Sequence, residues 1–363
     1  MAFGLEKVFS VLKQNTTPAP TKVVGIDFGA ASIKVVEIEQ RKNALALSSY
    51  GELQLGPYAE AELGRPVDLE KPKQIEALVD VLRESNIKAK DGVMALPLAS
   101  SFVTVMSMPA QANEDISPRV RVEARKYIPV PIADVTLDWT ELKQLGEAKT
   151  NVREVLIAAI QNESLGDMKD LMSAVQMTSQ PSEIELFGAI RGITKESDQT
   201  VAVIDLGAKT SKLYVAESGL LRRIHRVHSG GVHATEKLAE MQSVSFSEAE
   251  YIKRNFDAHS SDAKAVKSAV VTTFERPMQE FRRALEQFEA RNAESVSRIV
   301  LIGGSAAFAE LPQFASYMFD REVVRGNPFT KVAYPAFMEN TLTEIAPVFS
   351  VALGSALRPF EVG

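Results

Sequence analysis

The sequence contains no cysteine and only one tryptophan, and it has no long apolar run. Without cysteine the chain can form no disulfide and offers no thiolate to a metal, which fits a reducing compartment. No stretch approaches the ~20 apolar residues that cross a bilayer, and the N-terminus lacks the apolar core of a signal peptide. We therefore expect a cytoplasmic protein.

A strong excess of one charge is also lacking. Lys and Arg number 41 against 47 Asp and Glu, a net charge of −6. This balance provides no general attraction to nucleic acid or anionic lipid. The basic run at 222–226 has no interleaved aromatic residues, so we interpret it as a solvated strand face and expect no nucleic-acid partner. The 363 residues fit two domains or four small subdomains.

Residues 23–37 predict a β-hairpin whose turn suits a phosphate. An apolar run ends at Asp27, a tight turn follows, and a β-branched run then resumes. Gly29 lets the backbone approach a ligand closely, and Ser32 and Lys34 add a hydroxyl and a cation. Small residues, bare backbone N–H groups and a nearby cation are typical of phosphate-binding turns.

Residues 202–215 repeat this pattern without a gap. The aligned pairs are Ile26 and Ile204, Asp27 and Asp205, Gly29 and Gly207, Ala30 and Ala208, Ser32 and Thr210, and Lys34 and Lys212. An internal repeat of a hairpin indicates two similar halves that face each other. A third signal lies at 299–306, where a buried strand runs into a Gly-Gly turn.

These three stretches, in this order, resemble the actin-like ATPase superfamily, which includes actin, sugar kinases and the division protein FtsA. Further segments resemble more narrowly the type IV pilus assembly protein PilM family of its FtsA-like branch. They are 123–132, the pair Asp138-Trp139, 247–253 and 351–358. The resemblance implies an α/β, actin-like (ribonuclease H-like) duplicated ATPase fold, with two lobes and subdomains 1A, 1C, 2A and 2B.

The expected domains follow from this resemblance and from the hydrophobic periodicity. They are an N-terminal amphipathic helix and linker at 1–22, subdomain 1A at 23–90, an inserted subdomain 1C at 91–180, a connecting helix at 181–199, the second lobe at 200–340 with 2B at about 228–296, and a closing helix at 341–363. The amphipathic helix at 1–14 would dock on a membrane surface or a partner, or fold back on its own domain.

The periodicity also predicts individual elements. We expect helices at 166–177 and 307–318, and a long helix at 261–291 that Pro277 interrupts.

The resemblance implies ATP and Mg²⁺ as cofactors. Asp27 and Asp205 would face a common Mg²⁺, directly or through its waters, and the glycine turn would lie beside the adenosine. The implied nucleotide-binding residues are Asp27, Gly29, Ala30, Ser32, Lys34, Asp205, Gly207, Ala208, Lys209, Thr210, Lys237, Gly303, Gly304 and Ser305.

By resemblance, Glu185 is the candidate for orienting the attacking water, because it stands at the position of the glutamate that starts the key turn of the connecting helix in relatives. Relatives often have a Glu-Pro pair there, whereas Leu186 stands at the proline position in this chain. Glu185 has an alternative role as a cap or ion-pair partner of that helix. We therefore expect at most a slow ATPase.

By resemblance, the partner is the N-terminal cytoplasmic peptide of a PilN-like inner-membrane protein, bound between the first subdomain and the inserted module. Other pilus platform proteins and self-association are further expectations, and the chain would be peripheral at the inner membrane through its partners. A related secretion machine is an open alternative to the type IV pilus. So are a filament-forming, FtsA-like division ATPase and a small-molecule kinase of the same superfamily. No clear carboxylate base lies between the two hairpins for such a kinase.

Overall fold

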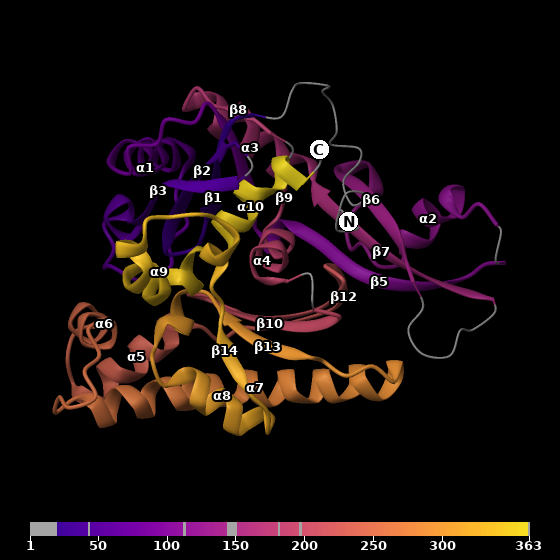
Figure 1. Ribbon diagram of the computed structural model, residues 1–363. Helices are drawn as coiled ribbons and strands as arrows, with labels where there is room; N and C mark the ends of the chain where they lie inside the picture. The colour runs from indigo at the N-terminus through magenta and orange to yellow at the C-terminus, as the bar shows by residue number, and fades with distance from the viewer. Residues whose placement is uncertain are drawn as a thin grey trace.

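The computed structural model describes residues 20–42, 44–111, 114–143, 151–180, 182–195 and 198–361 (Figure 1). The amphipathic helix predicted at 1–14 lies outside these residues. Within the described part of the chain, no helix combines the length and the apolar character that crossing a membrane requires.

The first lobe is built on a mixed sheet in the order β3-β2-β1-β4-β8, with β9 also paired to β4. Its strands are β1 (Lys22–Phe28), β2 (Ser32–Arg41), β3 (Ala44–Gln54), β4 (Asp91–Leu96), β8 (Thr178–Ser179) and β9 (Glu183–Ile184). Helix α1 (Lys71–Glu84) packs on β2 and β3 with Ala77, Leu78, Val81 and Leu82 buried. An amphipathic helix thus buries its apolar stripe against the sheet.

The second lobe has a sheet in the order β12-β11-β10-β13-β14. Its strands are β10 (Thr200–Leu206), β11 (Ser211–Glu217), β12 (Leu220–Val227), β13 (Arg298–Ile302) and β14 (Val323–Arg325). In each lobe an antiparallel hairpin pairs in parallel with a third strand, β1 with β4 and β10 with β13. The registers are equivalent, because Asp27 faces Lys34 and Asp205 faces Lys212. The internal repeat of the sequence is therefore a repeat of sheet topology.

Helices α5 (Gly231–Gln242), α6 (Phe246–Arg254), α7 (Ala263–Asn292) and α8 (Leu311–Phe319) complete the second lobe. Helices α7 and α8 run along one face of its sheet, opposite α4 (Glu185–Ile193) (Figure 1). Helix α7 continues through Pro277, where the sequence predicted a break. Proline offers no N–H to the carbonyl of Thr273, one turn earlier. The Ser229 hydroxyl donates to that carbonyl instead, at 3.0 Å.

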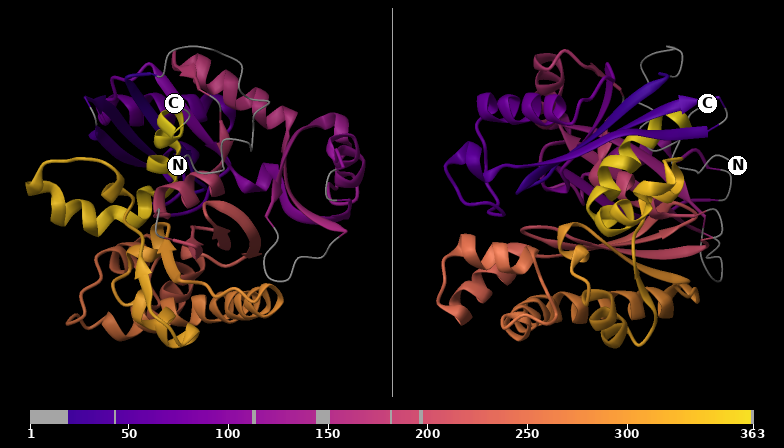
Figure 2. Two further views of the ribbon diagram at one scale, coloured as in Figure 1. Left: turned by 45° about the vertical axis from the view of Figure 1, so that its right-hand side comes forward. Right: turned by 60° about the vertical axis from the view of Figure 1, so that its left-hand side comes forward.

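The inserted module stands to one side of the first lobe (Figure 2). Its sheet, in the order β5-β7-β6, contains β5 (Ser101–Pro109), β6 (Val135–Leu142) and β7 (Val152–Gln161), with α2 (Ser117–Ala124). Strand β4 and the short strand β8 lie within the predicted subdomain 91–180 but belong to the first-lobe sheet instead. Helix α3 (Asn162–Ala174) contacts β4, β8 and α1 as well as β7. The separate module is therefore narrower than the predicted subdomain.

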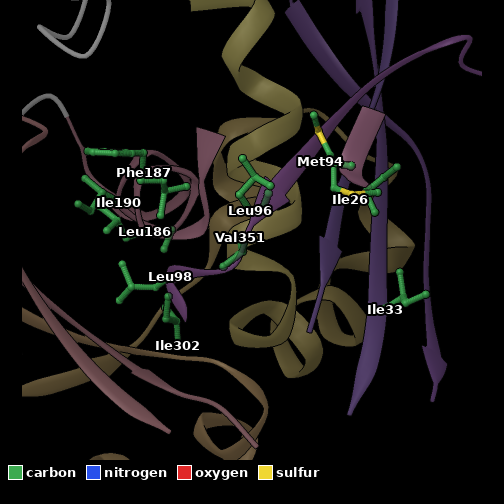
Figure 3. Close-up of a cluster of buried hydrophobic side chains, with 14 of the residues drawn as sticks. Ile26, Ile33, Met94, Leu96, Leu98, Leu186, Phe187, Ile190, Ile302 and Val351 are labelled. Carbon is green, nitrogen blue, oxygen red and sulfur yellow. The ribbon is translucent and has the colours of Figure 1, made fainter. Parts of the chain in front are cut away.

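Helix α10 (Ser350–Glu361) crosses α4 at very close range. A Cβ on Gly354 would lie 1.8 Å from the carbonyl oxygen of Gly188, so only glycine permits this approach. A shared apolar core surrounds the crossing: Leu186 and Phe187 of α4 lie with Val351 of α10 and Ile302 of β13 (Figure 3). The two lobes thus share one core at their junction.

Three further expectations differ from the structure. The helix predicted at 166–177 begins at Asn162, because Gly166 lies inside the helix instead of starting it. The segment predicted as one helix at 307–318 divides into a 3-10 turn, Gly304–Ala307, and α8, with Pro312 in the first turn of α8. The basic run on β12 is not uniformly solvated. Arg222 is buried and pairs with Glu217 and, across to β7, with Glu154 at 3.4 Å.

The closing segment is not one continuous helix. Helix α9 (Glu339–Ile345) is followed by a 3-10 turn, Ala346–Phe349, that contains Pro347, and then by α10.

Candidate functional site

A cavity of about 520 Å³ lies between the two lobes, at the ends of the duplicated hairpins. Both hairpin turns line it, together with the glycine turn after β13 and the first residue of α4. Because equivalent strands of the two sheets end there, the cavity is the place where the internal repeat brings its two halves face to face. A pocket at such a junction is typical of a ligand site.

The two turns have the same geometry. The N–H of Gly29 donates to the Ser32 carbonyl at 3.1 Å, and the N–H of Gly207 donates to the Thr210 carbonyl at 3.0 Å. Within the described residues, the turn N–H groups between these closures make no hydrogen bond to the protein; they belong to Ala30, Ala31, Ala208 and Lys209. Unpaired N–H groups at a cavity wall fit the oxygens of an anionic group such as phosphate.

The glycine turn after β13 closes another side of the cavity. Gly303 has a φ of +88°, and a Cβ there would lie 2.6 Å from the Asp205 carboxylate and 2.7 Å from the Leu206 carbonyl. Its N–H donates to the Pro347 carbonyl at 2.9 Å, which ties the turn to the segment before α10. Gly304 has open space around the position of a Cβ. The turn therefore presents flat backbone, which suits the face of a base or a ribose.

A buried ion cluster lies at the floor of the cavity. The Lys212 ammonium is 2.9 Å from Glu185 Oε1 and 3.2 Å from Asp205 Oδ2. Although burial alone lowers the pKa of Lys212, the carboxylates of Asp205 and Glu185 raise it well above its ordinary value. Lys212 is therefore a permanent cation between two carboxylates from α4 and β10.

Asp27 and Lys34 occupy the equivalent positions of the first lobe but are not joined in the same way. Within the described residues, the Asp27 carboxylate makes no ion pair or side-chain hydrogen bond. Burial raises the pKa of Asp27 to about 6; Lys34 opposes this rise, and the carboxylates of Glu185 and Asp205 add to it. Asp27 is thus the carboxylate of this site that is available to a further cation.

Glu185 has defined partners on both sides. Its Oε1 accepts from the Leu98 N–H at 2.9 Å and from Lys212 at 2.9 Å. Leu98 lies between β4 and β5, where the chain enters the inserted module. Glu185 lines the cavity at the start of α4, and it also ties the second lobe to the entrance of this module. Both its catalytic and its structural interpretations are compatible with this position.

Nearly all of the site residues predicted from the sequence line this one cavity; the exception is Lys237 of α5. The helix pair α5–α6 contributes Lys253 to the lining instead, held by Glu250 and by the Thr235 hydroxyl at 2.6 Å. Sequence reasoning also missed Lys212 as a site residue. The signal was present, since Lys212 aligns with Lys34 in the repeat.

Contacts across the outer side of the cleft link the two lobes. The Arg65 guanidinium lies 3.9 Å from the ring centroid of Phe246 and 3.6 Å from a Glu236 carboxylate oxygen. Arg254 of α6 donates to the Gln54 side chain, at the end of β3, at 3.2 Å. We call the contacts of Arg65 with Phe246 and Glu236 the Arg65 bridge. It joins the loop after β3 to α5 and α6.

Comparison with known proteins supports this architecture. The family model described as type IV pilus assembly protein PilM matches residues 25–360. A solved PilM-PilN type IV pilus biogenesis complex contains a chain that is 23% identical, with a TM-score of 0.76 over 95% of this chain and 100% of that chain. The fold is actin-like, as the sequence predicted.

Two other solved structures have the same fold at lower similarity. The ethanolamine utilization protein EutJ from Carboxydothermus hydrogenoformans is 16% identical, with a TM-score of 0.55 over 94% of this chain and 91% of that chain. MreB5 of Spiroplasma citri, solved with bound ADP, is 11% identical, with a TM-score of 0.52 over 95% of this chain and 98% of that chain.

Proposed function

The chain belongs to the type IV pilus assembly protein PilM family, and from this premise we propose that it is an ATP-binding scaffold of a pilus or related inner-membrane assembly platform. One observation supports nucleotide binding most directly: both turns present unpaired N–H groups to the same cavity. The two turns are placed to hold the phosphates, with Lys34 and Lys209 as neighbouring cations. Gly303 and Gly304 are placed beside the nucleoside.

Mg²⁺ accompanies the nucleotide in this proposal. The metal takes few carboxylates and completes its shell with phosphate oxygens and water. Asp27, which makes no side-chain ion pair among the described residues, is the protein group that best fits that role, directly or through water. Mg²⁺ would supply positive charge to the triphosphate. The protein would bind the phosphates, exclude water and hold the two lobes together.

Calorimetry with ATP and Mg²⁺ tests the nucleotide site, and Gly304→Leu is the blocking variant. A Cβ on Gly304 meets nothing within 4 Å and the residue lines the cavity, so leucine there fills the site without strain in the fold. The matched control is Gly166→Leu on α3, which also has open space but lies outside the cavity. We expect binding to the wild type and the control, and loss of at least about tenfold in affinity for Gly304→Leu. Wild-type protein that binds no nucleotide would overturn the proposal.

The second part of the proposal concerns the partner. We infer that the chain binds the N-terminal cytoplasmic peptide of a PilN-like inner-membrane protein, and that this contact holds it at the cytoplasmic face of the membrane. The similar solved chain comes from a PilM-PilN complex, which supports the choice of partner. The junction between the first-lobe sheet and the inserted module, around β4, β5 and α3, is the proposed groove, where an extended peptide can add to the edge strand β5 or lie in an apolar groove.

Hydrogen exchange with a synthetic PilN-like N-terminal peptide tests this location. We expect added protection at the β4–β5 junction and in α3, and unchanged exchange in α7 and α8. A peptide with the same composition in scrambled order is the control. Protection confined to the second lobe would contradict the proposed groove.

A further inference from the structure

Lys212 is an internal cation at the point where the carboxylates of the two lobes meet. Its side chain is only 11% exposed, and its ammonium contacts both Glu185 and Asp205. Lys212 also lines the cavity between the two turns. The charge is therefore buried, held in place and still adjacent to the space that a ligand would fill.

The equivalent lysine of the first lobe has different surroundings. Lys34 makes no ion pair within the described part of the chain, and its ammonium lies 3.3 Å from the position of a Cβ on Gly29. Lys34 therefore stands over the first turn and remains free for an anion. The two lysines share one position in the sequence repeat, but only Lys212 is engaged by carboxylates.

The carboxylates of the site fit a shared Mg²⁺ poorly. Asp205 already bonds the Lys212 ammonium through Oδ2. A fixed ammonium repels a metal cation at the same carboxylate and supplies one of the two positive charges that Mg²⁺ would bring. Asp205 is thus less suited than Asp27 to hold Mg²⁺ directly.

Taking the proposed nucleotide site as its basis, we propose that Lys212 is a resident counter-ion that replaces Mg²⁺ on the Asp205 side of the site. Asp27, Asp205 and Glu185 carry three negative charges, which the positive charges of Lys34, Lys209 and Lys212 balance. Without Lys212 this set has a net charge of about −1, which opposes a polyphosphate. The affinity of the chain for nucleotide should therefore depend only weakly on divalent cations. This dependence should become strong when the positive charge of Lys212 is removed.

The test is calorimetric titration of a non-hydrolysable ATP analogue, with excess Mg²⁺ and with chelator. For the wild type we expect chelation to weaken binding by less than about fivefold. For Lys212→Met we expect it to weaken binding by at least about tenfold more than in the wild type, about 1.4 kcal/mol. Lys212→Arg keeps the charge and should resemble the wild type, as should Lys73→Met on the exposed surface of α1.

Two outcomes overturn the proposal, and they are distinguishable. If chelation weakens binding equally in wild type and Lys212→Met, Lys212 is not a counter-ion, although the nucleotide site stands. If the wild type binds no analogue even with excess Mg²⁺, the nucleotide site itself fails, and the role of Lys212 fails with it.

A second variant protects the test against misfolding. Lys212→Met leaves two carboxylates without their buried partner, which is strongly destabilising. The double variant Lys212→Met with Glu185→Gln removes one charge of each sign and should retain the wild-type melting curve more closely. In this variant the expected dependence on Mg²⁺ is again greater than in the wild type, because Asp205 loses its resident cation. Wild-type dependence in the folded double variant would contradict the proposal.

Discussion

At the residue scale, the carboxylate of Asp27 makes one contribution to the pH dependence of stability in the ligand-free protein. Burial in the cavity wall raises its pKa to about 6 from the ordinary 3.8. The folded protein therefore holds this proton more tightly than the unfolded chain. Stability that depends on the bound proton is present in acid and is lost as pH rises from about 4 to about 6.

The asparagine side chain in Asp27→Asn does not titrate, so this variant should not lose stability as the pH rises through this range. Without nucleotide, wild-type stability should fall relative to that of the variant between pH about 4 and about 7. The change should be at most about 2 kcal/mol, because Asp27 is partly exposed to the cavity and solvent screens it. Urea unfolding of both proteins across this range measures the difference. A stability gap that does not change with pH would contradict the raised pKa.

At the element scale, the crossing of α4 and α10 depends on the absence of side chains. Gly354→Ala places a Cβ 1.8 Å from the Gly188 carbonyl oxygen, so one of the helices must shift. We expect a loss of about 1–3 kcal/mol in the free energy of unfolding, the usual effect of overpacking. Denaturant unfolding measures it.

Gly166→Ala is the matched control. Gly166 lies inside α3 with open space around the Cβ position, so alanine there should be neutral or stabilise the protein by up to about 1 kcal/mol. Equal effects at positions 354 and 166 would show that helix propensity, not the close crossing, determines the result.

Helix α7 shows how a proline is tolerated inside an element. The Ser229 hydroxyl donates to the Thr273 carbonyl, which Pro277 leaves without its helical partner. Ser229→Ala should therefore cost about 1 kcal/mol, the usual net contribution of a hydrogen bond. In a Pro277→Ala background the restored N–H competes for the same carbonyl, so the cost should become smaller. A double-mutant cycle from chemical denaturation measures this coupling, and strictly additive effects would contradict the explanation.

At the scale of the whole molecule, the Arg65 bridge spans the outer side of the cleft, where a bound nucleotide would leave. Arg65→Ala removes the contact with the Phe246 ring and the ion pair with Glu236. An exposed cation–π contact contributes about 0.5–1 kcal/mol, so we expect release of a fluorescent ADP analogue to become about two- to fivefold faster. Stopped-flow displacement by unlabelled nucleotide measures the rate.

Arg83→Ala, on the exposed side of α1, is the control and should leave the release rate unchanged. An unchanged rate in Arg65→Ala would mean that the bridge does not restrain opening of the cleft.

Much of the architecture follows from local sequence. The duplicated hairpins, the strand before Gly303, and the long helices were predictable because apolar periodicity and turn residues act over a few neighbours. The short strand β14 was missed, because three residues carry too little periodicity. The break predicted at Pro277 was wrong, because the Thr273 carbonyl that Pro277 leaves without a helical partner accepts a hydrogen bond from Ser229, far away in the sequence.

The sequence by itself therefore determined the repeat, the two facing turns, the carboxylates at their bases and the family. Each of these is encoded in contiguous residues whose chemistry can be read in order. Tertiary structure alone decided that Lys212 would join Glu185 and Asp205, that Lys253 would line the cavity in place of Lys237, and that Arg65 would bridge the cleft. These outcomes depend on charges from distant segments, because an ion pair or a cavity wall exists only where folding brings its members together.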